Sequence, residues 1–312
     1  MLGEYSKQIE ATDVFRIHNS FESLSDDDRD WLARVHAKLG IDSSLETRMR
    51  AGVAENQIFL NRVARHLPLE AETPGISRRV LPLVVAWDWS EEFACERNRV
   101  NNRIKTAVEK FTNSCDTSIV FSSMSRVAFD LSTHAKCTVF ESDGLKFAGH
   151  KFVIDELMKT GERMFIQPLV LDTCNRLHTN DNTLRVAVPD ACDTLGRLVL
   201  THGTIFDSRF TTGAKCDVVI TLFYLETVSC RLAVERIHTL LNKGGVWINC
   251  GPISDSTQTR EELSFEAINQ TIEHNEFFKI VEQEEIPTRY LCNFNSMMKT
   301  ETIGNFFVAK KL

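Results

Sequence analysis

The spacing of apolar residues divides the chain into a helical first part and an α/β remainder. Up to about residue 111, apolar positions recur every three to four residues, which is the period of a helix with one buried face. From Ser118 onward they gather instead in short β-branched and aromatic runs. We therefore expect an N-terminal helical module over residues 1–111 and a methyltransferase-like α/β domain over residues 112–312.

Three helices are expected in the first part. "LSDDDRDWLARVHAKLG" offers Ser25 as an N-cap and three aspartates in the first turn, where the positive end of the helix favours them, and Gly40 ends the helix. A second helix should run from about Leu45 to Leu67, before Pro68. Ser90 should cap a third helix, over "EEFACERNRVNNRIKTAVEKF".

Seven apolar runs in the second part predict seven strands. They are "SIVF", "CTVF", "RLVLTHG", "CDVVITLFYLE", "GGVWINCG", "FKIVEQE" and "GNFFVAK". The first five are separated by spans long enough for helices, which is the alternation of a doubly wound parallel sheet. The last two should form an antiparallel hairpin at the sheet edge. The expected fold is thus a seven-stranded, Rossmann-like sheet of the class I methyltransferase type.

Composition narrows the class of protein. A net charge of −7 disfavours direct binding to nucleic acid or to an anionic membrane. The nine cysteines contain no C-x-x-C pair and the nine histidines no H-E-x-x-H, so no zinc or redox site is expected. The polar N-terminus and the short apolar run "VLPLVVAW" indicate neither a signal peptide nor a membrane span. A cytoplasmic or nuclear location is the expectation.

Several strings resemble the carnosine N-methyltransferase family. "DWSEEFACER" resembles the family's D-W-S-x-x-G-x-x-E-R, and "LRVAVPDA" its I-x-F-P-D-V. "CDVVITLFYLET", "LLNKGGVWINCGP" and "RYLCNFNSMMK" resemble three further family strings, so the likeness covers nearly the whole chain. The resemblance implies transfer of a methyl group from S-adenosylmethionine to an imidazole nitrogen of carnosine. Such an enzyme mainly holds donor and acceptor in line and supplies complementary dipoles.

The resemblance also shows where the cofactor-binding positions have changed. The family's three turn glycines correspond to Phe121, Ser123 and Ser125. Serine in a left-handed conformation costs about 1–2 kcal/mol, and a phenylalanine ring takes up space beside the ligand. The polar pair that would hold the methionine part of the donor corresponds to Val84 and Trp87.

The nucleoside side of the cofactor site is partly retained. Glu141 matches the acid that accepts hydrogen bonds from ribose, although its position also suits an ordinary solvated acid at a strand end. Thr204 and Ile205 stand in place of the family's acid and aromatic residue near adenine, and Leu222 completes the cofactor-binding positions.

The acceptor side is altered as well. Glu226 is one methylene longer than the family's aspartate, and Ser256 replaces a histidine, whereas Tyr290 and Asn293 are retained. Glu226 and Tyr290 are the candidate catalytic residues.

Three functions remain open. The first is an inactive methyltransferase-like protein with a degenerate S-adenosylmethionine site, acting through a protein partner or as a homo- or hetero-dimer. The second is an active N-methyltransferase with a rebuilt donor site, acting on an imidazole dipeptide or another nucleophile. The third is a binding module for a different small ligand. Two structural expectations accompany them: the helices of residues 12–111 cover the sheet edge beside the donor cleft, and Trp87 and Phe121 fill part of that cleft.

Overall fold

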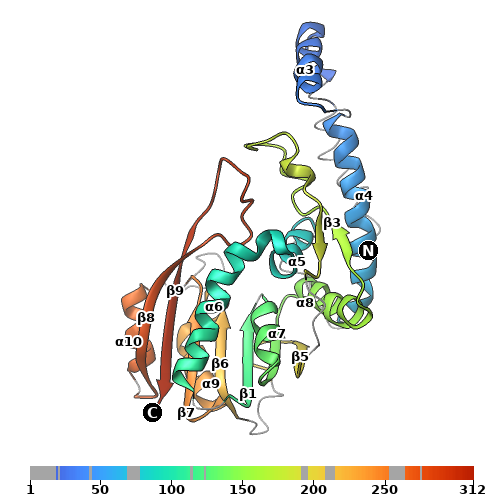
Figure 1. The fold of residues 1–312 in the computed structure, drawn as a ribbon. Coiled ribbons are helices and arrows are strands. Elements are labelled where there is room, and N and C mark those ends of the chain that lie inside the picture. Colours follow the sequence, from blue (N-terminus) through green and yellow to red (C-terminus); the bar gives the residue numbers. More distant parts are fainter. Residues whose placement is uncertain are drawn as a thin grey trace.

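A computed structural model shows the arrangement of the chain (Figure 1). The structure describes residues 19, 22–41, 44–68, 78–112, 115–122, 124–190, 196–207, 215–252, 264–274 and 276–312. The predicted loop "PLEAETPG" falls mostly outside these ranges.

The first two helices begin and end near the predicted residues. Helix α3 spans Asp26–Lys38, and the Ser25 side chain accepts a hydrogen bond from the Asp28 amide. Gly40 follows with φ of 66°, a conformation that glycine adopts without strain. Helix α4 spans Leu45–Val63 and continues as a 3₁₀ turn, Ala64–His66. The predicted cap of the first helix is therefore confirmed.

The expected cap of the third helix is wrong. Ser90 lies between helix α5 (Leu81–Trp89) and a 3₁₀ turn (Glu91–Phe93), and only then does α6 begin, over Ala94–Phe111. The Ser90 side chain makes no capping bond, because the 3₁₀ turn separates it from the first turn of α6. Its buried hydroxyl has no hydrogen-bond partner among the described residues.

The predicted sheet is confirmed. Seven strands occur in the order β5-β2-β1-β6-β7-β9-β8, with the first five parallel and β9 antiparallel to both β7 and β8. They are β1 (Thr117–Ser122), β2 (Lys136–Glu141), β5 (Leu198–His202), β6 (Cys216–Leu222), β7 (Leu241–Cys250), β8 (Phe278–Thr288) and β9 (Thr302–Lys311). The hairpin of β8 and β9 thus lies at one sheet edge, as expected.

Helices cover both faces of the sheet, and their apolar sides form two cores (Figure 1). Side chains alternate along each strand, so Val120 packs in one core and Phe121 in the other. The first core includes residues of α4 to α6, of α7 (Arg126–Ser132) and of α8 (Gly144–Phe152), which continues as a π-helix, Val153–Met158. The second includes α9 (Cys230–Leu240) and α10 (Phe265–Glu273).

A small antiparallel pair of strands was not predicted. Strands β3 (Met164–Ile166) and β4 (Val186–Val188) pair with each other, and β3 packs beside α4. Strands of three residues are too short to show a periodic apolar pattern, which explains why neither strand was predicted.

Buried polar contacts join α5 and α6 to the turn after β1. The Arg97 guanidinium donates to the carbonyls of Trp87 and Ser90, each at 2.9 Å, and to the Asp190 carboxylate at 2.9 Å. The Asp88 carboxylate accepts from the amides of Ser125 (2.8 Å) and Arg126 (3.0 Å). Arg126 also donates to Asp190 at 2.5 Å. Helix α6 thus packs against β7 and β8, and the end of α5 is joined to the turn after β1. Helix α3 instead lies away from the sheet, beyond the far end of α4 (Figure 1), so the expectation that the helices of residues 12–111 cover the sheet edge is wrong for α3.

We predict that Arg97→Ala lowers the free energy of unfolding by about 3–5 kcal/mol, because it leaves the buried Asp190 carboxylate without one of its two cations. Urea denaturation measures the change. The matched control is Arg231→Ala, which removes an exposed i,i+4 pair with Glu235 and should cost less than about 1 kcal/mol. Equal losses for the two variants would contradict a structural role for the buried pair.

Candidate functional site

The predicted cofactor-binding residues converge at the carboxyl ends of the parallel strands. The register pairs Phe121 of β1 with Phe140 of β2, and Ser122 with Leu222 of β6. Glu141 ends β2 beside His202 of β5. Thr204 and Ile205 follow directly after β5, and Ser125 precedes α7. Ser123 and Ser256 lie outside the described residues.

An aromatic cluster closes part of this edge. The Phe121 ring is fully buried, with centroids 5.5 Å from Phe140 and 5.4 Å from Tyr224. Ile205 belongs to the same core. The Trp87 ring is also buried and meets Tyr290 edge-on at 5.1 Å. Both rings therefore lie in the interior rather than in solvent, Trp87 in the first core and Phe121 in the second.

The part played by Tyr224 was not predicted. Its hydroxyl accepts a hydrogen bond of 3.0 Å from the Ile205 amide, and burial raises its pKa to about 12. The bond fastens the segment after β5 to the segment after β6. Tyr224 falls within the predicted run "CDVVITLFYLE", whereas β6 ends at Leu222, and the pairing with Ile205 is a long-range contact that local patterns do not show.

Glu141 is buried at the same edge. One carboxylate oxygen accepts from the Asp143 amide at 2.7 Å, whereas the other has no hydrogen-bond partner among the described residues. Burial raises the pKa of this carboxyl to about 7, against the attraction of Lys146 and the hydrogen bond from Asp143. Glu141 is thus not the solvated strand-end acid that its sequence position also allowed.

The other cofactor positions differ in exposure. Ser125 and Leu222 are buried, and Leu222 belongs to the same apolar core as Val120. The Ser125 hydroxyl has no hydrogen-bond partner among the described residues. Thr204 is exposed, and its hydroxyl accepts from the Phe206 amide at 3.3 Å.

On the acceptor side, Tyr290 is held by stacking. Its ring lies 4.4 Å from that of Phe223, with the two planes 25° apart. Phe223 has φ of 50°, an uncommon conformation for a bulky residue, and its amide donates to the Cys250 carbonyl. Gly251 has φ of 150°, and a Cβ there would lie 2.9 Å from the Phe223 nitrogen. The glycine of "NCGP" is therefore required by the close passage of Phe223.

A cavity of about 610 Å³ lies on the acceptor side and is lined in part by Tyr290 and Asn293. The Asn293 side chain donates to Asp172 at 3.0 Å. Glu226 does not line this cavity: it is half-buried in a 3₁₀ turn, Leu225–Thr227, just after β6. The structure therefore shows the two candidate catalytic residues on separate segments, with only Tyr290 at the cavity.

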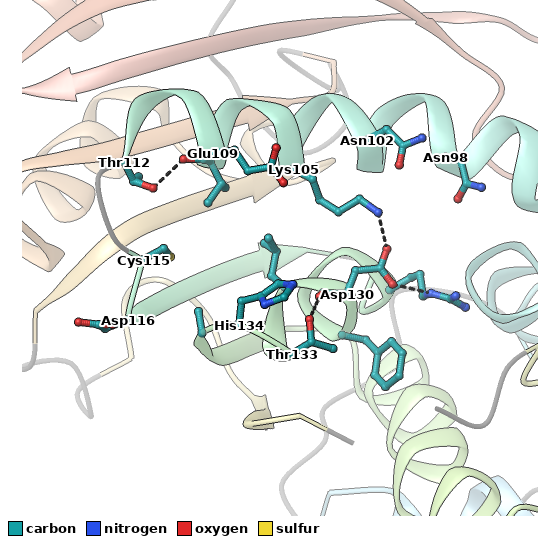
Figure 2. Close-up of a pocket in the computed structure, with 15 residues that line it drawn as sticks. Asn98, Asn102, Lys105, Glu109, Thr112, Cys115, Asp116, Asp130, Thr133 and His134 are labelled. Carbon is teal, nitrogen blue, oxygen red and sulfur yellow. Dashed lines mark hydrogen bonds and ion pairs between the residues drawn. The ribbon is translucent and has the colours of Figure 1, made fainter. Parts of the chain in front are cut away.

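A second cavity, of about 950 Å³, lies between α6 and α7 (Figure 2). Lys105 reaches across it to Asp130 at 3.2 Å, and Arg126 holds the same carboxylate at 3.0 Å. Neither this cavity nor the one at Tyr290 is lined by Phe121, Glu141 or Thr204.

Neither a metal site of the common histidine, cysteine and carboxylate type nor a membrane-spanning helix is found among the described residues. No three histidine, cysteine, aspartate or glutamate side chains there come together as metal ligands would. No helix in the described ranges is long and apolar enough to cross a bilayer.

Comparison with protein families gives a direct match. The family model described as carnosine N-methyltransferase matches residues 78–312, which is most of the chain. The chain belongs to this family. Together with the strand order, membership confirms the predicted α/β fold of the class I methyltransferase type. Helices α3 and α4 precede the matched segment.

Curated members of the carnosine N-methyltransferase family are distant relatives. "Carnosine N-methyltransferase unmet" of Drosophila melanogaster is 24% identical over 250 residues, which are 73% of this chain and 54% of that protein. The Rattus norvegicus carnosine N-methyltransferase is 31% identical over 101 residues, covering 30% of this chain and 25% of that protein. The one from Dictyostelium discoideum is 26% identical, over 54% of this chain and 39% of that protein. The aligned part thus spans about half of these relatives or less.

Solved structures are more distant still. The N-methyltransferase NodS from Bradyrhizobium japonicum WM9, in complex with S-adenosyl-L-homocysteine, has a TM-score of 0.44 and 11% identity, and covers 82% of this chain and 98% of that one. A methyltransferase from Pyrococcus furiosus has a TM-score of 0.39 and 11% identity, with coverage of 68% and 82%. Likeness at this level adds nothing to the family assignment.

The strings shared with carnosine N-methyltransferases supply the buried framework. Asp88 and Arg97 come from "DWSEEFACER", and Asp190 comes from "LRVAVPDA". These three side chains hold α5, α6 and the turn after β1 together. The retained strings therefore have a structural reason to persist that does not depend on cofactor binding.

We predict that Glu141→Gln flattens the pH dependence of stability between pH 4.5 and 7. Because the folded carboxyl has a pKa of about 7 against an ordinary 4.5, the folded state binds the proton more tightly. The contribution of protonated Glu141 to the free energy of unfolding is fully present below pH 4.5. It falls by at most about 1.4 kcal/mol per pH unit as the pH rises, and it is lost above pH 7.

Urea denaturation at several pH values measures this slope. Glu285→Gln, at an exposed position, serves as the control and should leave it unchanged. A wild-type slope identical to that of Glu141→Gln would show that Glu141 is not buried as described. Asp88, whose pKa burial also raises to about 7, contributes to the slope that remains in both variants.

Proposed function

We propose that this chain is a methyltransferase-fold protein that has lost efficient S-adenosylmethionine binding and acts through protein contacts, in the cytoplasm or the nucleus. The observation that carries the proposal is the aromatic contact between Phe121 and Tyr224. The chain spans only part of its curated relatives, so the lack of methyltransferase activity is likewise proposed for this chain and not transferred from them.

The contact lies where a doubly wound sheet ordinarily binds its ligand. In such sheets, ligands occupy the crevice outside the strand carboxyl ends, at the point where the strand order reverses. In this sheet the reversal falls between β1 and β6, because β2 and β5 extend to one side and β7 to the other. Phe121 is on β1, and Tyr224 comes two residues after β6, so their rings meet across this point.

The polar groups nearby do not fit a charged donor either. The amides of Ser125 and Arg126 already donate to Asp88, and the guanidinium groups of Arg97 and Arg126 already donate to Asp190. The sulfonium donor carries an amino acid group with a carboxylate, for which a guanidinium would be the strong partner. Val84 and Trp87, at the matched positions, are buried and pack in or beside the apolar core.

Two features favour a second candidate function, an active N-methyltransferase with a rebuilt donor site. A Glu141 oxygen is buried without a partner in the described residues, and Tyr290 and Asn293 line a cavity of about 610 Å³. A hydroxylated ligand would satisfy that oxygen. A single carboxylate contact contributes about 1.5–3 kcal/mol, which is well short of the −8 kcal/mol of a micromolar site.

We predict that the purified chain shows no calorimetric binding of S-adenosylmethionine at micromolar concentration and no methylation of carnosine. The aromatic cluster excludes the donor, and the nearby amides and guanidinium groups are already bonded. The Rattus norvegicus carnosine N-methyltransferase is the matched positive control for both assays. A dissociation constant at or below about 10 μM would replace this function with the active alternative.

We further predict that Phe121→Gly opens the strand-end crevice without restoring tight binding, because neither Val84 nor Trp87 offers a cation to the carboxylate of the donor. Removing a buried phenylalanine ring costs about 3–5 kcal/mol, which urea denaturation measures. Phe93→Gly, at an equally buried position outside this cluster, is the control for the loss of an aromatic ring. Binding of the donor by Phe121→Gly at about 10 μM or below would show that the ring alone excludes it.

A further inference from the structure

Three sulfur-bearing side chains line the cavity of about 610 Å³ that also contains Tyr290: Cys174, Cys292 and Met298. Cys174 is exposed and Cys292 is half-buried, so solvent and dissolved ions have access to both thiols. Met298 is 71% exposed, although methionine is ordinarily an interior residue. The cavity thus combines two thiols and a thioether in a place where a dissolved ion can enter.

Hydrogen bonds hold together the two segments that carry these sulfur atoms. The Asn293 side chain donates to the Asp172 carboxylate at 3.0 Å, and the Asn175 side chain donates to the Met298 sulfur at 3.0 Å. Each of the two donors is the immediate neighbour of one of the cysteines in the sequence. Two backbone hydrogen bonds and an antiparallel bridge join the same segments next to these contacts. The three sulfur-bearing residues therefore lie on segments that the fold already keeps side by side.

The backbone beside both cysteines is uncommon. Asn175 and Leu291 each have φ of 54°. Asparagine enters this left-handed region readily, whereas a leucine seldom does. Residues held in such conformations gather at ligand-binding sites. The conformation of Leu291 therefore points to a ligand at this cavity independently of the sulfur atoms.

The ligand set favours a soft metal ion. Magnesium and calcium take oxygen ligands, whereas thiolate and thioether sulfur select Cu(I). Structural Zn²⁺ sites need four cysteine, histidine or carboxylate ligands, and no three such side chains come together in the residues that the structure describes. The Asp172 carboxylate of this cavity also already accepts a hydrogen bond from Asn293. Two thiols and a thioether are therefore better suited to Cu(I) than to zinc.

We propose that Cys174, Cys292 and Met298 bind a Cu(I) ion. The two thiols each release a proton to solvent, two sulfur–copper bonds form, and the Met298 sulfur gives a lone pair to the metal in place of its bond to the Asn175 amide. No electron is transferred, and the copper stays monovalent. Because thiolates and not thiols are the ligands, the affinity rises with pH. The proposal does not depend on the state of the donor cleft.

The test is a competition for Cu(I) between the full chain and the chromophoric chelator bicinchoninate, under nitrogen and with a reductant present. We expect the wild type to withdraw the metal from the chelator in equimolar amount. Cys174→Ser and Cys292→Ser should each bind at least about tenfold more weakly, because each removes a thiolate ligand. Met298→Leu, which keeps the side-chain volume, should also weaken binding by about tenfold.

Two controls separate this site from other thiols. Cys95→Ser removes an exposed cysteine of α6 that does not line the cavity, and it should leave the affinity unchanged. X-ray absorption of the copper-loaded chain should show one sulfur neighbour fewer in Met298→Leu than in the wild type. A wild type that does not compete for Cu(I), or a variant with both Cys174→Ser and Cys292→Ser that binds as tightly as the wild type, would overturn the proposal. Unchanged affinity and absorption in Met298→Leu would overturn it as well. S-adenosylmethionine is absent from these measurements, so their failure is distinct from a failure of the proposed function.

Discussion

The buried ion pair of Arg97 and Asp190 fixes the rest of the structure. Both side chains are almost fully buried, at 2% and 4% exposure, so the loss of either one removes a counter-ion from a buried charge. The Arg97 guanidinium also donates hydrogen bonds to the carbonyls of Trp87 and Ser90. These two carbonyls, at the end of α5 and before the 3₁₀ turn, therefore have hydrogen-bond partners although they are buried. Arg126, the first residue of α7, donates to the same Asp190 carboxylate and so links it to the turn after β1. Helices from the first part of the chain are thereby held at the strand ends.

The same network limits what the strand-end crevice can offer a ligand. It uses the amides at the start of α7, through Asp88, and both nearby guanidinium groups. Phe121, Phe140 and Tyr224 meet at the reversal of strand order, and the Tyr224 hydroxyl is bonded to the Ile205 amide. The Glu141 carboxyl and the Ser125 hydroxyl are the polar side chains at this edge that keep an atom without a partner among the described residues. The framework that holds the strand ends together is thus built from side chains that do not need a bound donor.

The sequence predicted most of the fold and less of the site. Strong β-branched runs such as "CDVVITLF" determine their strands locally, and Ser25 caps its helix because the first turn follows at once. Ser90 failed as a cap because a 3₁₀ turn intervenes, and the Ser90 carbonyl there accepts from Arg97, whose guanidinium is held by the distant Asp190. The positions of the site residues followed from strand ends, but Tyr224 and Phe223 act through ring contacts with segments distant in sequence. No local pattern contains that information.

Hydrogen exchange at the Ile205 amide tests the central claim most directly, because this amide is bonded to Tyr224 in the closed crevice. Exchange should be followed by NMR without ligand and with S-adenosylhomocysteine at about 1 mM, a concentration at which only sites tighter than about −4 kcal/mol fill. The account predicts that Ile205 is protected in the free chain and that the ligand leaves its protection and that of Ser125 unchanged. Rapid exchange in the free chain, with protection appearing when the ligand is added, would contradict it.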